Sequence, residues 1–411
     1  MSQNRAILPQ QGVSFDDIKA DLRQTMIDDV RGHWSRSFRA PKDVQEVGSY
    51  AYNLFLSDNG LFSMRTEYLR RIEEDVISMC TGLFNGPADS SGTFTSGGSE
   101  SIYSALHAMR EWAKVHRPNA HAPEVVAPYS AHPSFSKGCH YFGLKLVRTE
   151  LGPDLKASPD AMRAAITDNT IGMVGSAPCW PYGNYDPIAD LAAIAKDAGI
   201  WMHVDACVGG YLAPFMEKLG RPLPAWDFRL PGVMSISADL HKLGYCLKPA
   251  STIMWRSEDL KQYHYVHPDD WPGGQYSMTG FAGSRSAGPI FAAWAIMRYL
   301  GEAGYMRLAE DLMLKKAKLL QGIGSIEGLE PWYNDLLPVC FGATDVDLGA
   351  VKGELGKLGW ILVACARPPL INIPLDAATD DRVLDCFLDD LHAITRRVRS
   401  SGGQAREELR Y

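Results

Sequence analysis

The sequence lacks the features that mark membrane, secreted and nucleic-acid-binding proteins. None of its apolar runs approaches the roughly 20 residues needed to cross a bilayer, and the best candidate, Pro289 to Met297, ends at Arg298. The N-terminus has no apolar signal core, so we expect a cytoplasmic protein. A net charge of -7 argues against nucleic-acid or anionic-membrane partners, because both select basic surfaces.

Paired cysteines are also missing. The eight cysteines form no Cys-x-x-Cys motif, which argues against zinc ribbons and thioredoxin-like redox sites and predicts dispersed, reduced thiols. A His-Tyr-Val-His segment, His264 to His267, stands close to Asp269 and Asp270. It lies in a Pro/Gly-rich loop without further ligands, so we expect no metal site.

The chain is long enough to need more than one hydrophobic core. Between residues 54 and 288, β-branched runs such as GIWMHVDA and GVMSISAD alternate with helical stretches such as DPIADLAAIAKDAG. This alternation predicts an α/β domain with a mostly parallel sheet covered by helices on both faces. We expect an N-terminal helical arm over residues 1–53, and a small α+β domain over residues 289–411. The small domain should contain helices over 290–300 and 304–322 and strands at GWILVACA and LINIPL.

A glycine pair opens one of the predicted helices. The segment Thr95 to Glu100 reads TSGGSE and precedes the helical run SIYSALHAMREWAK. Glycines let the backbone approach an anion closely, and a helix start offers free N–H groups. Ser99 is expected to serve as N-cap and phosphate ligand. Alone the segment is more often an ordinary turn, and it lacks the Gly-Lys-Ser/Thr ending of a nucleotide-binding loop.

Two further polar residues follow predicted strands. Asp205 ends the run WMHVD, and in an open parallel sheet ligands gather at the carboxyl ends of strands. A carboxylate there can hold a protonated pyridine nitrogen, although it can equally cap a turn. Lys242 follows the strand-like SISAD and stands beside His241, where loss of water and nearby charges would tune its amine. A lysine without such neighbours would usually lie on the surface. Here Lys242 follows the predicted anion-binding segment TSGGSE, then Asp205 and His241, and this order argues against a surface position.

Several longer stretches resemble the group II pyridoxal-phosphate decarboxylase family, and within it the branch of the sphingosine-1-phosphate lyases and their bacterial relatives. They span Leu61 to Arg285 almost continuously: GLFNGPADSSG, TSGGSESI, VVAPYSAHPSFSKGCHYFGLKLVR, APCWPYGNYDPIADLAAIA, HVDACVGGYLAPFMEKLG, SISADLHKLGY and DDWPGGQY with the later AGSR. The resemblance implies fold type I, as in aspartate aminotransferase, with a seven-stranded-type sheet. It also implies pyridoxal 5'-phosphate as cofactor and a homodimer with shared active sites.

The resemblance also implies roles for the cofactor site. Lys242 matches the Schiff-base lysine, Asp205 the partner of the pyridine nitrogen, and His132 the histidine that stacks on the ring. Gly98 and Ser99 match the phosphate cup. Two more positions complete this set, with Cys207 packing under the other ring face and His241 touching the phosphate or assisting proton transfer.

Substrate-side residues are implied in the same way. Lys248 matches a lysine that lies toward the substrate's own phosphate. Gly273, Gly274 and Tyr276 belong to a loop that, in the family, reaches the neighbouring subunit's cofactor. The chain departs from the lyases at Phe62, in a stretch where they have a phosphate-facing histidine. This departure favours an unphosphorylated, more hydrophobic substrate.

Three functions are consistent with these residues. The favoured one is a carbon–carbon lyase that cleaves a β-hydroxy amine or amino acid by a retro-aldol reaction. The second is an L-amino-acid decarboxylase, in which Arg367 would bind the substrate carboxylate. The third, a cofactor-binding protein without catalysis, is disfavoured by the presence of Lys242, Asp205 and His132. The sequence does not decide which of His132, His241 and the nearby tyrosines acts as the catalytic acid or base.

Overall fold

The large sheet is built from strands that alternate with helices along the chain. The computed structural model describes residues 11–25, 30–35, 38–62, 66–274, 276–277 and 280–400. The sheet has the strand order β1-β7-β6-β5-β4-β2-β3. Its strands are β1 (Ser91–Thr95), β2 (Glu124–Pro128), β3 (Lys145–Thr149), β4 (Thr170–Ser176), β5 (Trp201–Asp205), β6 (Val233–Ala238) and β7 (Ser251–Trp255). β7 is antiparallel to both of its neighbours, whereas the other pairings are parallel.

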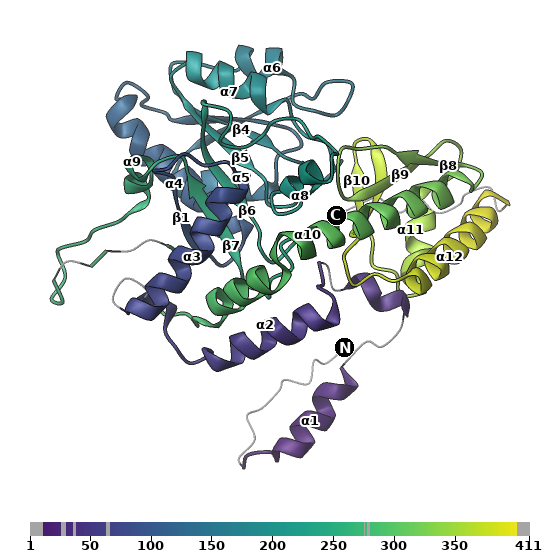
Figure 1. Cartoon of the computed structure of the whole chain (residues 1–411). Coiled ribbons are helices and arrows are strands. Elements are labelled where there is room, and N and C mark those ends of the chain that lie inside the picture. Colours follow the sequence, from purple (N-terminus) through teal and green to yellow (C-terminus); the bar gives the residue numbers. More distant parts are fainter. Residues whose placement is uncertain are drawn as a thin grey trace.

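Helices cover both faces of this sheet (Figure 1). The helices of this region are α3 (Glu67–Leu83), α4 (Gly98–His116), α5 (Pro133–Phe142), α6 (Pro159–Ala164), α7 (Ile188–Asp197), α8 (Ala213–Lys218) and α9 (Glu258–Lys261), with short 3-10 turns η2 (Gly60–Phe62) and η3 (Gln262–His264). Neighbouring residues of one strand enter different cores: Val125 shares a buried cluster with residues of α4 and α5, and Val126 belongs to the other cluster, which includes Met162 of α6. This is the period-2 alternation expected of a strand buried on both faces.

Parallel pairing fixes where the chemistry can occur. The strands β1, β2, β4, β5 and β6 run in one direction, so their carboxyl ends meet at one edge of the sheet. The residues that follow those strands are therefore neighbours in space although they are far apart in the sequence. Open α/β sheets bind ligands at this edge.

A smaller domain follows the large one. Its sheet has the antiparallel order β10-β11-β9-β8, with β8 (Leu329–Trp332), β9 (Val339–Ala343), β10 (Val363–Ala366) and β11 (Pro369–Ile373). It carries α11 (Leu348–Lys357) and α12 (Asp381–Ser400). The long α10 (Gly288–Gly324) joins the two parts and is interrupted at Gly301, where φ is 53° and glycine is favoured.

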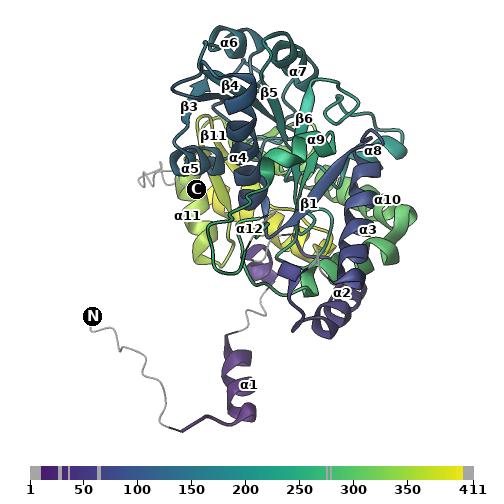
Figure 2. The ribbon, with the colours of Figure 1, turned by 90° about the vertical axis from the view of Figure 1, so that its left-hand side faces the viewer.

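The N-terminal residues divide between two surroundings. α1 (Phe15–Gln24) buries none of its residues and stands away from the body in both overall views (Figures 1 and 2). The 3-10 turn η1 (Val30–Ser35) instead packs on the small domain, and α2 (Lys42–Leu54) lies along α10. Trp34 is 1% exposed and contacts Trp360 and Phe387 of the small domain.

The fold class predicted from the sequence is confirmed. β5 and β6 occupy the predicted apolar runs, and α10 combines the two predicted helices on either side of Gly301. The small domain has β8 and β9 in addition to the two strands expected there. The boundaries at residues 53 and 288 stay predictions. No helix in the described ranges is long and apolar enough to span a membrane.

The aromatic cluster of Trp34, Trp360 and Phe387 should be the main contact that holds the N-terminal segment on the small domain. Phe387 is fully buried, so we expect Phe387→Ala to lower the free energy of unfolding by about 3–5 kcal/mol, because it leaves a cavity. Tyr333→Ala is the matched control, since Tyr333 is 76% exposed, and should change it by less than about 0.5 kcal/mol. Denaturant unfolding measures the change in free energy for each variant. Equal changes in the two variants would contradict the role given to the aromatic cluster.

Candidate active site

The strand ends surround one cavity of about 490 Å³. Its lining comes from the loops after β1, β2, β4, β5 and β6, with one residue from the N-terminal segment and one from the small domain. These residues are Phe38, Ser96, Gly97, Gly98, Ser99, Glu100, Ile102, His132, Ser176, Pro178, Trp180, Asp205, Cys207, Val208, Asp239, His241, Lys242 and Val363. The structure thus brings together Gly98, Ser99, His132, Asp205, Cys207, His241 and Lys242, as the sequence predicted.

Lys242 is paired with a carboxylate. Its Nζ lies 2.7 Å from Oδ2 of Asp239, which is 2% exposed. Burial alone would lower the pKa of Lys242, but the charge of Asp239 outweighs burial and holds that pKa well above 10.5. Burial would likewise raise the pKa of Asp239, yet Lys242 keeps it below 3.8. The pair is therefore an ion pair when nothing else is bound to the amine.

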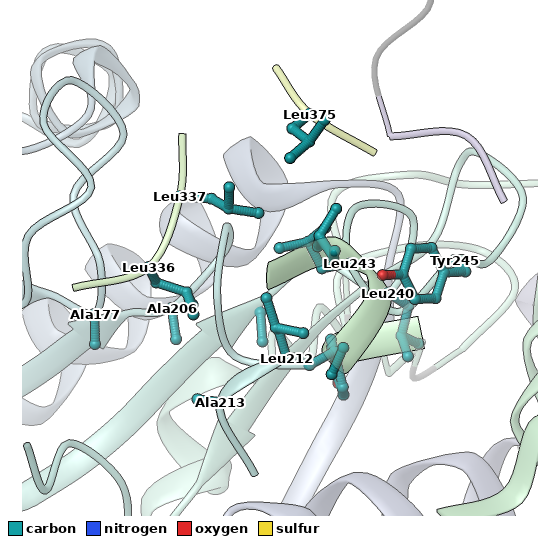
Figure 3. Packing of buried hydrophobic residues seen from close by; sticks show 14 of the residues in the cluster. Ala177, Ala206, Leu212, Ala213, Leu240, Leu243, Tyr245, Leu336, Leu337 and Leu375 are labelled. Carbon is teal, nitrogen blue, oxygen red and sulfur yellow. The ribbon is translucent and has the colours of Figure 1, made fainter. Parts of the chain in front are cut away.

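Apolar neighbours fix the turn that carries Lys242. Leu240 and Leu243, on either side of His241 and Lys242, are fully buried. Figure 3 shows them packed among Leu212 of the large domain and Leu337 of the small domain. The lysine turn is thus held from both domains, which limits the positions open to the amine.

Asp205 lies at the carboxyl end of β5 and is 7% exposed. Its Oδ1 accepts a hydrogen bond from the backbone N–H of Cys207 at 3.1 Å and one from Oγ of Ser237 at 3.4 Å. These two donors hold the carboxylate in one orientation, and Asp205 lines the cavity. Asp205 can therefore present a negative charge to a cationic ring nitrogen in the cavity.

The N-terminus of α4 approaches the strand ends very closely. A Cβ on Gly98 would lie 2.8 Å from Sγ of Cys207 and 2.9 Å from Oδ2 of Asp239, so only glycine fits. The prediction that Ser99 caps this helix is wrong, because Gly97 is the N-cap and Ser99 lies within the first turn. There Oγ of Ser99 is 2.8 Å from Oγ of Ser134. Glu100, three residues after the cap, instead accepts the N–H of Ser96 at 2.7 Å.

Both histidines of the cavity use Nδ1 as an acceptor. His132 caps α5 and accepts the N–H of Ser134 at 3.2 Å, while His241 accepts the N–H of Ala250 at 3.1 Å. A backbone N–H can only donate, so each neutral ring carries its proton on Nε2. Burial lowers the pKa of both histidines, which favours these neutral forms.

Cys207 is a packing residue rather than a nucleophile in this geometry. It is 6% exposed, and burial raises the pKa of its thiol well above the usual value. A protonated, buried thiol is a small apolar group and a poor nucleophile. This agrees with the expected position of Cys207 beneath a planar ring.

Five predicted residues do not line the cavity, among them Gly273 of the loop after η3. Lys248 and Arg367 are exposed, Arg367 in the turn between β10 and β11, and Gly274 and Tyr276 lie in the loop after η3. Figure 1 shows this loop projecting beyond the large sheet. The side chain of Phe62 lies outside the described residues. The roles given to these positions stay predictions.

The sequence reasoning missed other lining residues. Asp239 stands three residues before Lys242 in SISADLHK, and this spacing of a carboxylate and a lysine was a usable signal. No sequence pattern marked Trp180 or Phe38 as a cavity residue. Phe38 and Trp180 meet edge to face, with ring centroids 5.9 Å apart. Val363 comes from the small domain, and no local pattern places it here.

Comparison with known proteins decides the family. The pyridoxal-dependent decarboxylase conserved domain matches residues 2–330. The chain belongs to this pyridoxal-dependent decarboxylase family. It is 36% identical over 401 residues to mouse sphingosine-1-phosphate lyase 1, covering 95% of this chain and 70% of that protein. A probable L-tyrosine/L-aspartate decarboxylase of Methanothermobacter thermautotrophicus is 32% identical over 342 residues, covering 83% of this chain and 91% of that protein.

A solved structure agrees with these matches. The sphingosine-1-phosphate lyase Bpss2021 of Burkholderia pseudomallei superposes with a TM-score of 0.90 at 32% identity, covering 97% of this chain and 94% of that one. The protein is therefore a pyridoxal-phosphate-dependent lyase, and its cofactor is pyridoxal 5'-phosphate.

The residues present fit this cofactor. The cradle at Gly98, which any Cβ would fill, leaves room for an anion at the start of α4. The carboxylate of Asp205 and the amine of Lys242 face the same cavity, as a pyridine nitrogen and an aldehyde on one ring require. Lys242 would hold the cofactor covalently, Asp205 its ring nitrogen, and the Gly97 to Ser99 backbone its phosphate.

The ion pair predicts how the cofactor-free enzyme responds to pH. Asp239→Asn leaves the Lys242 charge buried without its partner, so we expect a loss of about 3–5 kcal/mol of stability at pH 7. In the parent, the pair contributes fully between the two ordinary pKa values of 3.8 and 10.5. Its contribution is lost only as the pH falls below the first or rises above the second. In the variant, burial lowers the pKa of Lys242, so stability should rise with pH between 7 and 10.

An exposed ion pair of the same length is the control. Asp385 Oδ1 lies 2.7 Å from Lys318 Nζ, with 60% and 37% of the two side chains exposed. Asp385→Asn should therefore change the stability by less than about 1 kcal/mol. Denaturant unfolding of the cofactor-free forms between pH 6 and 10 measures both variants. A pH-independent loss in Asp239→Asn would contradict the charge assignment.

Proposed function

We propose that this protein cleaves a β-hydroxy amine or β-hydroxy amino acid between Cα and Cβ, releasing an aldehyde and an amine by a retro-aldol reaction. The observation that carries the proposal is the Lys242–Asp239 pair, 2.7 Å apart, in a cavity shared with Asp205 and His132. The similarity to sphingosine-1-phosphate lyases from animals, plants, yeast and bacteria supports this reaction over others of the family.

The cofactor, when bound, stabilises the electron pair left on Cα when a bond to that carbon breaks. Asp205 supports this by holding a proton on the ring nitrogen. If the substrate amine took the place of Lys242 on the cofactor, Lys242 would be left beside Asp239 as a neutral amine. Because Asp239 raises the pKa of Lys242, this neutral amine would accept a proton readily and return to the ion pair with Asp239. It takes the proton of the β-hydroxyl as the Cα–Cβ bond breaks and Cβ becomes the aldehyde carbon.

His132 and His241 act as hydrogen-bond donors in this scheme. Each neutral ring has its proton on Nε2, since Nδ1 accepts a backbone N–H. Such a group cannot accept a proton at Nε2 without first exchanging its tautomer. The rings therefore suit the orientation of oxygen atoms, on the cofactor or the substrate, better than general-base catalysis.

An apolar wall favours a hydrophobic substituent on the substrate. Phe38, Trp180 and Val363 line one part of the cavity and come from three regions of the chain. Burying an alkyl or aryl group against such a wall contributes roughly 25 cal/mol per Å² of area removed from water. The wall agrees with the expectation, first suggested by Phe62, of an unphosphorylated hydrophobic substrate.

Decarboxylation of an L-amino acid is the second candidate. The match to the archaeal probable L-tyrosine/L-aspartate decarboxylase, over 91% of that protein, supports it. The same cofactor chemistry would serve, because loss of CO2 also leaves an electron pair on Cα. Arg367 lies in the exposed turn after β10, four residues after the cavity residue Val363. It would be the residue that binds the second carboxylate of an acidic substrate.

The assembly and location belong to the same proposal. We infer a cytoplasmic homodimer in which the loop containing Gly273, Gly274 and Tyr276 serves the partner's cavity. The exposure of residues 269–274 supports this, because in one chain these residues do not reach its own site.

Product analysis tests the reaction. Purified holoenzyme is given a long-chain β-hydroxy amine, the same amine phosphorylated, and aromatic and acidic L-amino acids, with Lys242→Ala as the inactive control. We expect a long-chain aldehyde from the unphosphorylated amine and no CO2 from the amino acids. CO2 without aldehyde would establish the decarboxylase instead. Turnover of the phosphorylated amine alone would contradict the unphosphorylated substrate.

A further inference from the structure

A buried row of polar side chains lies behind Asp205. β5 and β6 are parallel neighbours, with His203 opposite Ser235 and Asp205 opposite Ser237. Residues two apart on a strand share a face, so Trp201, His203 and Asp205 of β5 point to the same side. Trp201, His203, Ser235 and Ser237 are each 0% exposed. Polar groups with so little access to water must satisfy one another.

Short contacts join these groups in sequence. Nε1 of Trp201 is 2.8 Å from Oγ of Ser235, which is 2.8 Å from Nδ1 of His203. On the other side of the ring, Nε2 of His203 is 3.2 Å from Oγ of Ser237. Ser237 Oγ in turn lies 3.4 Å from Oδ1 of Asp205. The row thus runs without a break from the indole to the carboxylate that faces the cavity.

The direction of every hydrogen bond in the row is determined by its two ends. The indole N–H can only donate, and an ionised carboxylate can only accept. Ser237 must therefore give its one proton to Asp205 and accept from Nε2–H of His203. Nδ1 of His203 then has no proton and accepts from Ser235, which accepts from Trp201. Each hydroxyl proton is used once, and all four bonds point toward Asp205.

His203 is suited to this arrangement because it stays neutral. Burial lowers the pKa of His203 to about 4, so the ring carries a single proton at physiological pH. The other group beside Ser237 is the Cys207 thiol, whose raised pKa keeps it protonated. A thiol S–H can donate to the second lone pair of Ser237 without reversing the row.

We propose that Trp201, Ser235, His203 and Ser237 form a polarised hydrogen-bond relay that holds the Asp205 carboxylate oriented toward the ring nitrogen of the cofactor. These are positioning residues, since they act on the cofactor through Asp205. The relay rests on the proposed role of Asp205 as the partner of the ring nitrogen. A carboxylate held toward the ring nitrogen stabilises the proton there, so the relay should raise the pH at which that nitrogen loses its proton.

The test follows the ring nitrogen directly. Holoenzyme is reconstituted with pyridoxal 5'-phosphate labelled with ¹⁵N in the ring, and the ¹⁵N resonance is titrated with pH. Ser237→Ala removes the donor to Asp205 and should lower the pH of deprotonation by about one to two units, the loss expected for one charge-assisted hydrogen bond. Ser237→Thr, which keeps the hydroxyl, should restore most of it. His203→Gln, Ser235→Ala and Trp201→Phe should give successively smaller shifts.

The control separates the relay from general destabilisation. Ser104 of α4 is also 0% exposed but lies outside the row, so Ser104→Ala should not shift the titration. Thermal unfolding is recorded for every variant. If Ser237→Ala does not fold, His203→Gln takes its place in the ¹⁵N titration. Variants that lose stability without any shift in the ¹⁵N titration would overturn the relay.

Asp205→Asn distinguishes failure of the relay from failure of the site assignment. If Asp205→Asn shifts the ring-nitrogen titration while Ser237→Ala and His203→Gln do not, Asp205 keeps its role and the relay is wrong. If Asp205→Asn itself causes no shift, the proposed partner of the ring nitrogen is wrong. A graded response along the row, largest at Ser237, is the result that the relay predicts.

Discussion

The amine of Lys242 and the carboxylate of Asp239 lie 2.7 Å apart at the cavity, with 23% and 2% of the two side chains exposed, and the fold holds them in this position. Such a pair adds little net stability compared with apolar residues of the same size, whereas losing one partner is costly. Its value is therefore chemical. The pair keeps a reactive amine in one place. It is protonated while it is paired with Asp239, and it would be strongly basic when it leaves the cofactor as a neutral amine.

The fold provides this environment by a simple rule of topology. Parallel strands end at one edge, so residues that follow β1, β2, β4, β5 and β6 converge although more than a hundred positions separate the first from the last. Gly98 allows the start of α4 to approach that edge within contact distance of Asp239. Phe38 and Val363 then bring the N-terminal segment and the small domain to the same cavity. The substrate pocket thus depends on how distant parts of the chain pack, while the residues of the cofactor site are placed chiefly by the strands of the sheet and the turns that follow them.

This difference explains what the sequence could predict. Apolar runs and the residues that follow them located Asp205, His241 and Lys242, because strand, turn and polar residue are adjacent in the chain. Phe38 and Val363 are brought in by long-range packing that leaves no local pattern. Ser99 was misassigned as a helix cap. Gly97, two residues earlier, is the N-cap, and the side chain of Glu100 accepts a hydrogen bond from the backbone N–H of Ser96. Asp239 can be seen in the segment SISADLHK, but its pairing with Lys242 is shown only by the 2.7 Å between the two side chains in the structure.

The most direct measurement identifies the lysine that binds the cofactor. Holoenzyme is reduced with borohydride, which fixes the cofactor on its lysine, and the digested chain is mapped by mass spectrometry. The modified residue should be Lys242, whose amine faces the cavity beside Asp239. Lys248, six positions later and exposed, should remain unmodified. Modification of Lys248, or of any lysine other than Lys242, would contradict the account.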